Sequence, residues 1–252
     1  MSPKATQPDR PSAAEEIPDC PNCGKPMPLC ICEEIEAIDN RVEVLILQHP
    51  QEQDRALGTA RLTALNLANA TLKIGLSWPS LSKALGRDVD PQRWAILYLG
   101  SAKLADLDTD RDLVAIDRKG QLEDGQRGIM KEIEGVVLLD GTWSQAKALW
   151  WRNAWMLKCR RVILGPKRPS RYGKLRKEPR ADGLSTIESA GMILSRLEGR
   201  DEIETALNAT FERLLARYRE VQSTMPQLAP KPRPKRDYRK PEKRRGKAAR
   251  QA

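Results

Sequence analysis

The apolar positions of the chain form short aliphatic runs that alternate with longer amphipathic stretches. Five runs predict buried strands, at 42–48, 94–100, 113–116, 135–140 and 161–165. They are rich in Val, Ile and Leu, as are strands that both faces of a parallel sheet bury. Helical spacing predicts helices at about 53–70, 144–157, 186–198 and 201–220. This alternation predicts an α/β fold with a mainly parallel sheet.

Length and composition set the predicted domain organisation. The 252 residues suffice for one large domain with appendages. The sequence contains no run of about 18 apolar residues and no charged-then-apolar leader, so we expect no membrane span, no secretory signal and a cytoplasmic location. We predict a disordered lead-in at 1–19, a zinc-binding hairpin at 20–36, a large α/β domain at 37–222 and a disordered basic tail at 223–252.

Positive charge is concentrated at the C-terminal end of the chain. From Pro230 to Ala252, eleven Lys or Arg residues stand against Asp237 and Glu242, a net charge of +9. The whole chain carries +10, so the remainder sums to about +1. Such a segment forms no core, and we expect a disordered arm that binds nucleic-acid phosphates. The alternative is a tail that only keeps the protein soluble.

Four of the five cysteines lie within thirteen residues, in CPNCGKPMPLCIC. The spacing of Cys20, Cys23, Cys30 and Cys32 is typical of a zinc knuckle, in which four thiolates close a tetrahedral shell. We therefore expect a structural zinc ion, without an open position at which water is activated. A redox pair is the alternative, but nothing thioredoxin-like surrounds it. Cys159 lies between a predicted helix and a predicted strand and is expected in the core.

The stretch VVLLDGTWSQAKALWW places polar residues directly after a predicted strand. Ligands of α/β proteins bind at the carboxyl ends of parallel strands, where helices begin. Asp140 is a candidate general base or an anchor for a ligand's ammonium group, and Gly141 allows a ligand close to the backbone. Thr142 is a candidate helix cap with amides exposed to an anion. Trp143 either stacks on a base or packs in the core.

The single histidine of the chain, His49, follows another predicted strand in LQHPQE. It therefore marks a second polar strand end, together with the acid Glu52, although a structural role is the alternative for a lone histidine. The nearby stretch GTARL contributes Thr59 and Arg61, whose hydroxyl and guanidinium groups suit the same crevice. The alternative for Arg61 is a solvated position on a helix.

The stretch RPSRYGKLRKEPRADGLSTIESA is a basic loop that leads into a helix. Arg171, Arg176 and Tyr172 suit a carboxylate or phosphates held bidentately beside an aromatic face. Ser185 and Glu188 have the spacing of a capping box, so a purely structural role for this pair stands beside a ligand-binding one.

Together these motifs resemble the DTW-domain family, named for its Asp-x-Thr-Trp signature. The resemblance rests on DGTW, CPNCGKPMPLCIC, HPQE, GTARL, SRYGKLRKEP and LSTIE, which occur in family order between residues 20 and 198. The chain departs from the family at residues 97–102, where it has LYLGSA and many members have an LFPG-like segment.

The resemblance implies a tRNA-uridine aminocarboxypropyltransferase. Such enzymes move the 3-amino-3-carboxypropyl group of S-adenosylmethionine to N3 of a uridine in tRNA and release methylthioadenosine. The resemblance also implies a fold related to the SPOUT methyltransferases, whose cofactor pocket is built from a knotted C-terminal region. It makes the predicted α/β domain the catalytic domain.

This chemistry requires that the γ-carbon of the donor, and not its methyl group, faces N3. Orientation of this kind contributes roughly 7–11 kcal/mol in the most favourable cases. We expect Arg176 or Arg61 to bind the donor's carboxylate, Glu188 or Glu52 to bind its ammonium group, and Asp140 to be the general base. The predicted catalytic residues are Asp140, Thr142, Trp143 and, as the reserve base, His49. The predicted donor-binding residues are Glu52, Thr59, Arg61, Gly100, Gly141, Arg176, Ser185, Thr186 and Glu188.

The expected partner is tRNA, held by the basic loop, the zinc hairpin and the tail, because proteins bind RNA through phosphates, shape and unstacked bases. The predicted contacts of the loop are Lys167, Arg168, Arg171, Tyr172, Lys174 and Lys177. No protein partner is indicated.

Two other functions remain open at this point. A SPOUT-like RNA methyltransferase shares the fold and the donor but releases S-adenosylhomocysteine. A zinc-hairpin RNA-binding protein would not catalyse any reaction. The polar residues at the strand ends favour an enzyme, because RNA binding alone does not require them.

Overall fold

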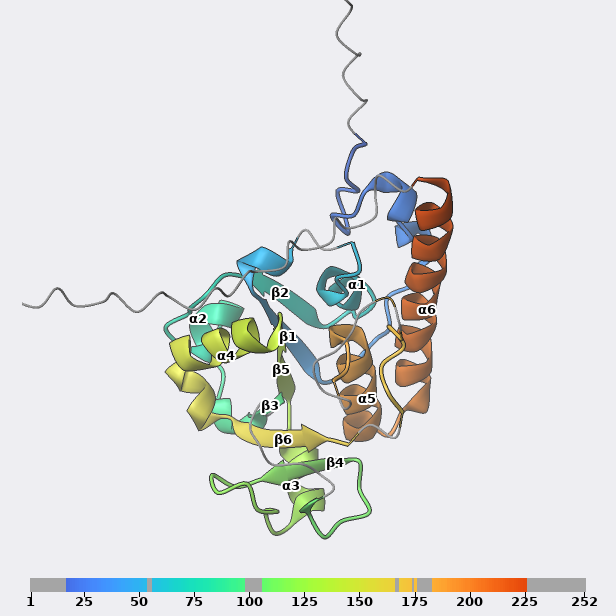
Figure 1. The fold of residues 1–252 in the computed structure, drawn as a ribbon. Helices are drawn as coiled ribbons and strands as arrows, with labels where there is room; N and C mark the ends of the chain where they lie inside the picture. The colour runs from blue at the N-terminus through green and yellow to red at the C-terminus, as the bar shows by residue number, and fades with distance from the viewer. Residues whose placement is uncertain are drawn as a thin grey trace, which may run out of the picture.

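A six-stranded sheet lies between two layers of helices in the computed structural model, which describes residues 17–53, 56–97, 106–165, 168–173, 175 and 183–225 (Figure 1). The strands are β1 (Glu43–Gln48), β2 (Ala70–Ile74), β3 (Trp94–Leu97), β4 (Leu113–Ile116), β5 (Gly135–Asp140) and β6 (Arg160–Leu164). Their order is β2-β1-β5-β3-β6-β4, and all neighbours are parallel except β6 and β4. The predicted α/β fold with a mainly parallel sheet is therefore confirmed.

Alternate residues of the central strands face the two helical layers. Val44 and Ile46 of β1 belong to the core beneath α1 (Ala60–Leu65), α5 (Thr186–Glu198) and α6 (Asp201–Thr224). Leu45 and Leu47 belong to the core beneath α2 (Leu81–Leu85) and α4 (Trp143–Arg152). The remaining α-helix of the described residues, α3 (Gln126–Glu132), packs against β4 at one edge of the sheet (Figure 1). Burial on both faces explains why the strands are uninterrupted aliphatic runs.

Gly135 allows the two central strands to pack against a large side chain. It lies opposite Trp94 in the register of β5 and β3. A Cβ atom at this position would stand 2.5 Å from the indole of Trp94, which is itself buried. Only glycine fits there, because a rigid ring cannot move away from a backbone-fixed methyl group.

Four of the predicted strands and two of the predicted helices match observed elements closely, but two helices do not. The prediction of one long helix over 53–70 is wrong. The described part of this stretch contains only the short helix α1, which follows the 3-10 turn η3 (Pro50–Glu52) and precedes strand β2. The helix predicted at 144–157 breaks at Asn153, where the side-chain amide binds the backbone carbonyls of Leu149 and Leu76, and the chain continues as the 3-10 helix η6 (Ala154–Lys158). Residues 98–100, the end of the strand predicted at 94–100, lie outside the described residues.

None of the helices in the described part of the chain combines the length and the apolar character that crossing a membrane requires.

Candidate active site and metal centre

Asp140 is the last residue of β5 and is held by two other segments of the chain, the end of β1 and the start of α5. The parallel register places Gln48 beside it, and the Gln48 amide donates a hydrogen bond to Asp140 Oδ2 at 2.9 Å. From α5, the hydroxyl of Thr186 donates to Oδ1. The His49 amide donates to the Asp140 carbonyl at 2.9 Å. We call Gln48, His49, Asp140, Gly141 and Thr186 the strand-end corner.

The carboxylate of Asp140 retains hydrogen-bonding capacity. Within the described residues each of its two oxygens receives one side-chain donor, and a carboxylate oxygen can accept two. It is only partly buried. Asp140 is therefore an oriented acceptor that can still receive a proton or a donor group from a ligand.

The turn after Asp140 is shaped by a capping box. Thr142 accepts a hydrogen bond from the Gln145 amide at 3.4 Å, and the Gln145 side chain accepts one from the Thr142 amide at 2.6 Å. A Cβ atom on Gly141 would stand 2.9 Å from Gln145 Cβ and 3.5 Å from His49 Cβ. Gly141 therefore brings the first turn of α4 against the strand end, and the hydroxyl of Thr142 is engaged as the helix cap.

His49 lies in the strand-end corner, but a local hydrogen bond fixes its ring. Its Nδ1 accepts from the Gln51 amide at 3.2 Å. The neutral ring then carries its proton on Nε2 and presents a donor outward. This arrangement suits a hydrogen bond to a ligand better than removal of a proton from one.

Three more predicted residues lie on η3 and at the start of α1. Thr59 is buried, and its hydroxyl accepts a hydrogen bond from the Ile187 amide at 3.4 Å, which ties the start of α1 to the start of α5. Glu52 is only 4% exposed on η3. The Nε atom of Arg61 is buried and has no hydrogen-bond partner within the described ranges. Arg61 is therefore a cation with a donor available to an anion.

Glu188 organises the start of α5. Its Oε2 accepts hydrogen bonds from the amide and hydroxyl of Ser185 at 2.9 and 2.6 Å and from the Ser170 hydroxyl at 2.7 Å. Its Oε1 accepts from the Arg171 amide at 2.8 Å, and the Arg171 guanidinium lies 3.7 Å away. The capping box predicted from sequence is confirmed, and four donors occupy this buried carboxylate.

The basic loop divides between the core and the surface. Tyr172 is 2% exposed, donates its hydroxyl to the Leu57 carbonyl at 2.8 Å and packs edge-on against Phe211. The structure therefore places Tyr172 in the core and not at the surface position expected for it. Arg171 also pairs with Glu212 at 3.0 Å, whereas Arg168 is exposed. The other predicted residues of the pocket and the loop, Gly100, Lys167, Lys174, Arg176 and Lys177, lie outside the described residues.

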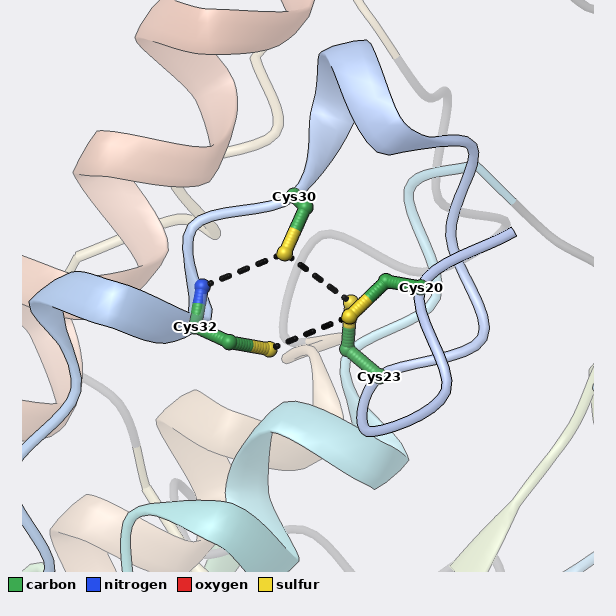
Figure 2. A group of neighbouring side chains, drawn as sticks. All are labelled: Cys20, Cys23, Cys30 and Cys32. Atoms are coloured by element: carbon green, nitrogen blue, oxygen red, sulfur yellow. Dashed lines mark hydrogen bonds between the residues drawn. The ribbon is translucent and has the colours of Figure 1, made fainter. Parts of the chain in front are cut away.

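The four clustered cysteines point their sulfur atoms toward one another (Figure 2). All four sulfurs lie within 4.8 Å of each other, with Cys20 to Cys32 at 3.8 Å and Cys23 to Cys30 at 3.9 Å. Zinc–sulfur bonds of about 2.3 Å give a tetrahedron with edges of about 3.8 Å, whereas a disulfide requires about 2.05 Å. The donor set and its spacing fit a zinc ion. We call residues 20–32 the cysteine knuckle.

The thiol pKa values of the cysteine knuckle shift in both directions. The Cys23 backbone amide is the main cause that lowers the pKa of Cys20 to about 7. Burial raises the pKa of Cys23 and of Cys32. A cation at the centre would favour all four thiolates, since metal binding displaces their protons. Outside the knuckle, burial raises the pKa of Cys159 to about 12, in keeping with the core position expected for it.

Lys25 is a residue that the sequence patterns did not identify. It lies in the cysteine knuckle but is 3% exposed, and its Nζ donates to the carbonyls of Ala56 and Gly58 at 2.7 and 2.8 Å. Burial lowers its pKa to about 8, while the charges of Cys23 and Asp140 act in the opposite direction. A lysine in a short polar hairpin normally lies in solvent, so only its place between two cysteine pairs could have drawn attention to it.

The backbone carbonyl of Leu57 lies between those of Ala56 and Gly58, and it accepts a hydrogen bond from the Tyr172 hydroxyl. Three consecutive carbonyls that precede Thr59 and Arg61 are thus held by two buried side chains from distant parts of the chain. The cysteine knuckle is in this way fastened to the segment that shapes the corner.

These features define an α/β protein with a cysteine knuckle and a polar corner at the carboxyl ends of its parallel strands. The chain belongs to the DTW domain family, whose profile matches residues 17–219. The resemblance seen in the motifs is thereby confirmed.

The chain is also similar to proteins named tRNA-uridine aminocarboxypropyltransferase 2 from three animals. It is 26% identical to the Macaca fascicularis protein and 28% identical to the Mus musculus protein, each match covering 77% of this chain and 61% of the relative. It is 30% identical to the Drosophila melanogaster protein, over 75% of this chain and 70% of that protein. The chain thus spans about three fifths of the length of the two mammalian relatives. No solved structure matches it significantly.

Proposed function

We propose that this protein is a tRNA-uridine aminocarboxypropyltransferase that uses S-adenosylmethionine as the donor. Three relatives carry the name of this transferase, and the donor is the one that the family resemblance implies. The observation that carries the proposal is the placement of Asp140. Its carboxylate is held by Gln48 and Thr186 at the carboxyl edge of the sheet and keeps acceptor capacity for a substrate.

In this proposal Asp140 is the general base for uridine N3. Asp140 accepts the N3 proton, N3 forms a bond to the γ-carbon of the donor, and the bond from this carbon to sulfur breaks. The electron pair of the broken bond stays on sulfur, which yields neutral methylthioadenosine. The contacts of Gln48 and Thr186 orient the carboxylate before the substrate arrives, so it need not reorganise during the transfer. The hydrogen bond at His49 Nδ1 makes His49 a donor to the substrate and not the base.

The observed contacts distinguish between the residues predicted to bind S-adenosylmethionine. We assign the carboxylate of the donor to Arg61, whose buried Nε has no partner in the described part of the chain. We assign the ammonium group to the buried Glu52, because Glu188 already receives four hydrogen bonds. Gly141 would support the pocket by bringing α4 against the strand end, Thr59 through its contact with Ile187, and Ser185 through its cap contact with Glu188.

Zinc is proposed as a structural ion of the cysteine knuckle. Bound by four thiolates, it supplies cross-linking and no Lewis acid chemistry, because no ligand position stays open. The zinc ion would affect the reaction through Lys25. An ordered knuckle positions Lys25, and the hydrogen bonds of Lys25 in turn position residues 56–58.

The remaining predictions extend this proposal to the whole protein. We propose that tRNA is bound in the cytoplasm and that Arg168, the rest of the basic loop and the tail contact its phosphates. The predicted division into lead-in, hairpin, catalytic domain and tail belongs to the same proposal. The relationship to the SPOUT fold, with its knotted C-terminal region, stays a prediction from the family resemblance.

Isotopic labelling of the donor tests the reaction. Purified protein is incubated with unmodified tRNA and S-adenosylmethionine labelled either in the methyl group or in the carboxyl carbon. The proposal predicts that only the carboxyl label enters tRNA. Entry of the methyl label would instead establish a methyltransferase, and tRNA binding without entry of either label would establish a non-catalytic RNA-binding protein.

A further inference from the structure

The segment after the strand-end corner has an unbroken excess of positive charge. Residues 141–177 include eleven Lys or Arg residues and no Asp or Glu. Acids from elsewhere neutralise some of this charge: Arg160 pairs with Glu132 at 3.1 Å and Arg171 with Glu212 at 3.0 Å. The charge that stays unpaired is therefore the part that can attract an anionic partner.

Three of these cations lie on α4 and at the end of η6. Lys147, Arg152 and Lys158 are exposed, and none of them forms an ion pair with another described residue. Exposed cations without nearby acids create a positive field in solvent and attract polyanions over a distance of about 10 Å at moderate salt.

Trp151 lies among these cations and is unusually exposed. Its side chain is 79% exposed, whereas Trp94 and Trp155 are 1% and 6% exposed. It adds little to the core in this position, because an indole stabilises a fold by burial. An exposed indole face is, however, a platform on which an unpaired base stacks.

The helix aligns two of these side chains, Lys147 and Trp151, with Ser144 in one stripe that begins next to the strand-end corner. Ser144, Lys147 and Trp151 are exposed at the three- and four-residue spacing that places side chains on one face. The Ser144 hydroxyl lies 3.2 Å from that of Thr142, in the turn after Asp140. Trp151 is eight residues beyond Trp143, which corresponds to roughly 12 Å along the helix. Figure 1 shows α4 leaving the end of β5 on the face of the sheet opposite α5 and α6.

We propose that the exposed face of α4, together with the end of η6, is a docking surface for the tRNA substrate, with Trp151 stacked on an unpaired base and Lys147, Arg152 and Lys158 on phosphates. This surface rests on the proposed function, and it is separate from the basic loop at 168–177. The charge favours RNA over a protein partner, because a hydrophobic protein interface would be depleted of cations such as lysine. A stripe of roughly 12 Å matches three to four stacked nucleotides at about 3.4 Å each.

Equilibrium binding of the full-length protein to unmodified tRNA, without donor, tests this surface over a range of salt concentrations. Trp151→Ala is expected to weaken binding about ten-fold, and Trp151→Phe to retain most of the affinity because it keeps an aromatic face. Lys147→Ala is expected to lower the slope of log affinity against log salt by about one. Lys119→Ala is the matched control, an exposed lysine in the turn after β4, and should change neither quantity.

The outcomes separate this surface from the proposed function. Unchanged tRNA affinity in Trp151→Ala and Lys147→Ala, with a wild-type protein that binds and modifies tRNA, overturns the docking surface alone. A wild-type protein that does not bind tRNA overturns both. If Trp151→Ala keeps its tRNA affinity but loses self-association in sedimentation, the face is a protein interface instead. Donor binding and melting temperature should match wild type in every variant, because these side chains are exposed.

Discussion

The carboxylates of Asp140 and Glu188 differ in how many further hydrogen bonds their oxygens can accept. Glu188 receives four hydrogen bonds from its own helix cap and the adjacent loop. Asp140 receives one side-chain donor on each oxygen, so it is fixed in direction but not saturated. The contacts thereby fit separate roles for two acids near the start of α5: Glu188 in the fold, and Asp140 in the proposed chemistry.

Replacing Asp140 by Asn tests the chemical role. The amide keeps the shape of the side chain and one acceptor for Thr186 or Gln48, but it cannot take the N3 proton. We expect kcat to fall about 10²- to 10⁴-fold, with donor affinity close to that of wild type. Single-turnover kinetics and calorimetry measure the two quantities. Asp88→Asn, an exposed acid before β3, is the control, and equal turnover in both variants would remove Asp140 from the mechanism.

Lys25 tests whether the cysteine knuckle supports the donor pocket. In Lys25→Met the carbonyls of Ala56 and Gly58 lose their buried donor, and the segment before Thr59 and Arg61 is expected to loosen. We predict that donor affinity falls about ten-fold while the zinc content is unchanged. Lys25→Arg, which keeps the charge and the donors, should restore most of the affinity. A Lys25→Met variant with wild-type donor affinity would contradict the positioning role.

At the scale of elements, the start of α5 depends on Glu188. A glutamine there presents an NH₂ group either to the Arg171 amide or to the three donors from Ser170 and Ser185. Because donor then faces donor, we expect Glu188→Gln to lower the free energy of unfolding by about 2–3 kcal/mol. Urea denaturation measures the loss. A change within about 0.5 kcal/mol, as for an ordinary surface substitution, would show that the network contributes little.

The cysteine knuckle is the second element whose order affects the site. We expect about one zinc ion per chain by elemental analysis, and Cys23→Ser should lower both the zinc content and the melting temperature. Cys159→Ser is the matched control, since Cys159 is buried 139 residues after Cys20 and outside the cluster. Its zinc content should equal that of wild type. Full zinc content in Cys23→Ser would contradict a four-thiolate site.

The comparison of sequence with structure is also clearest at the element scale. Buried strands such as Gly135–Asp140 were predicted closely, because aliphatic runs between polar turns have few alternatives. Edge strand β2 was missed since its residues are only partly buried, and its pattern ATLKI continued the helical spacing of α1. The helix cap at Thr142 and the capping box at Ser185 follow from local spacing and were predicted. The burial of Tyr172 and Lys25 could not be predicted from local spacing, because their hydrogen-bond partners lie far away in the sequence. The partner of Tyr172 is 115 residues away, and those of Lys25 are more than 30 residues away.

For the molecule as a whole, charge and site are arranged around one edge of the sheet. The acids Asp140, Glu52 and Glu188 lie near that edge in the fold, whereas residues 141–177 carry only basic charges. A polyanion would be drawn toward α4 and the basic loop, and a small zwitterionic donor toward the acids and Arg61. This separation fits a protein that must bring a nucleic acid and an amino-acid-bearing donor to one carboxylate.

The most direct test of this account is a mass-spectrometric measurement of both products of one reaction. The full-length protein is incubated with S-adenosylmethionine and unmodified tRNA, and the nucleosides and the small molecules are then analysed together. The account predicts a uridine heavier by one 3-amino-3-carboxypropyl group and an equal amount of methylthioadenosine. A methylated nucleoside with S-adenosylhomocysteine, or no modified nucleoside from a broad tRNA pool, would contradict it.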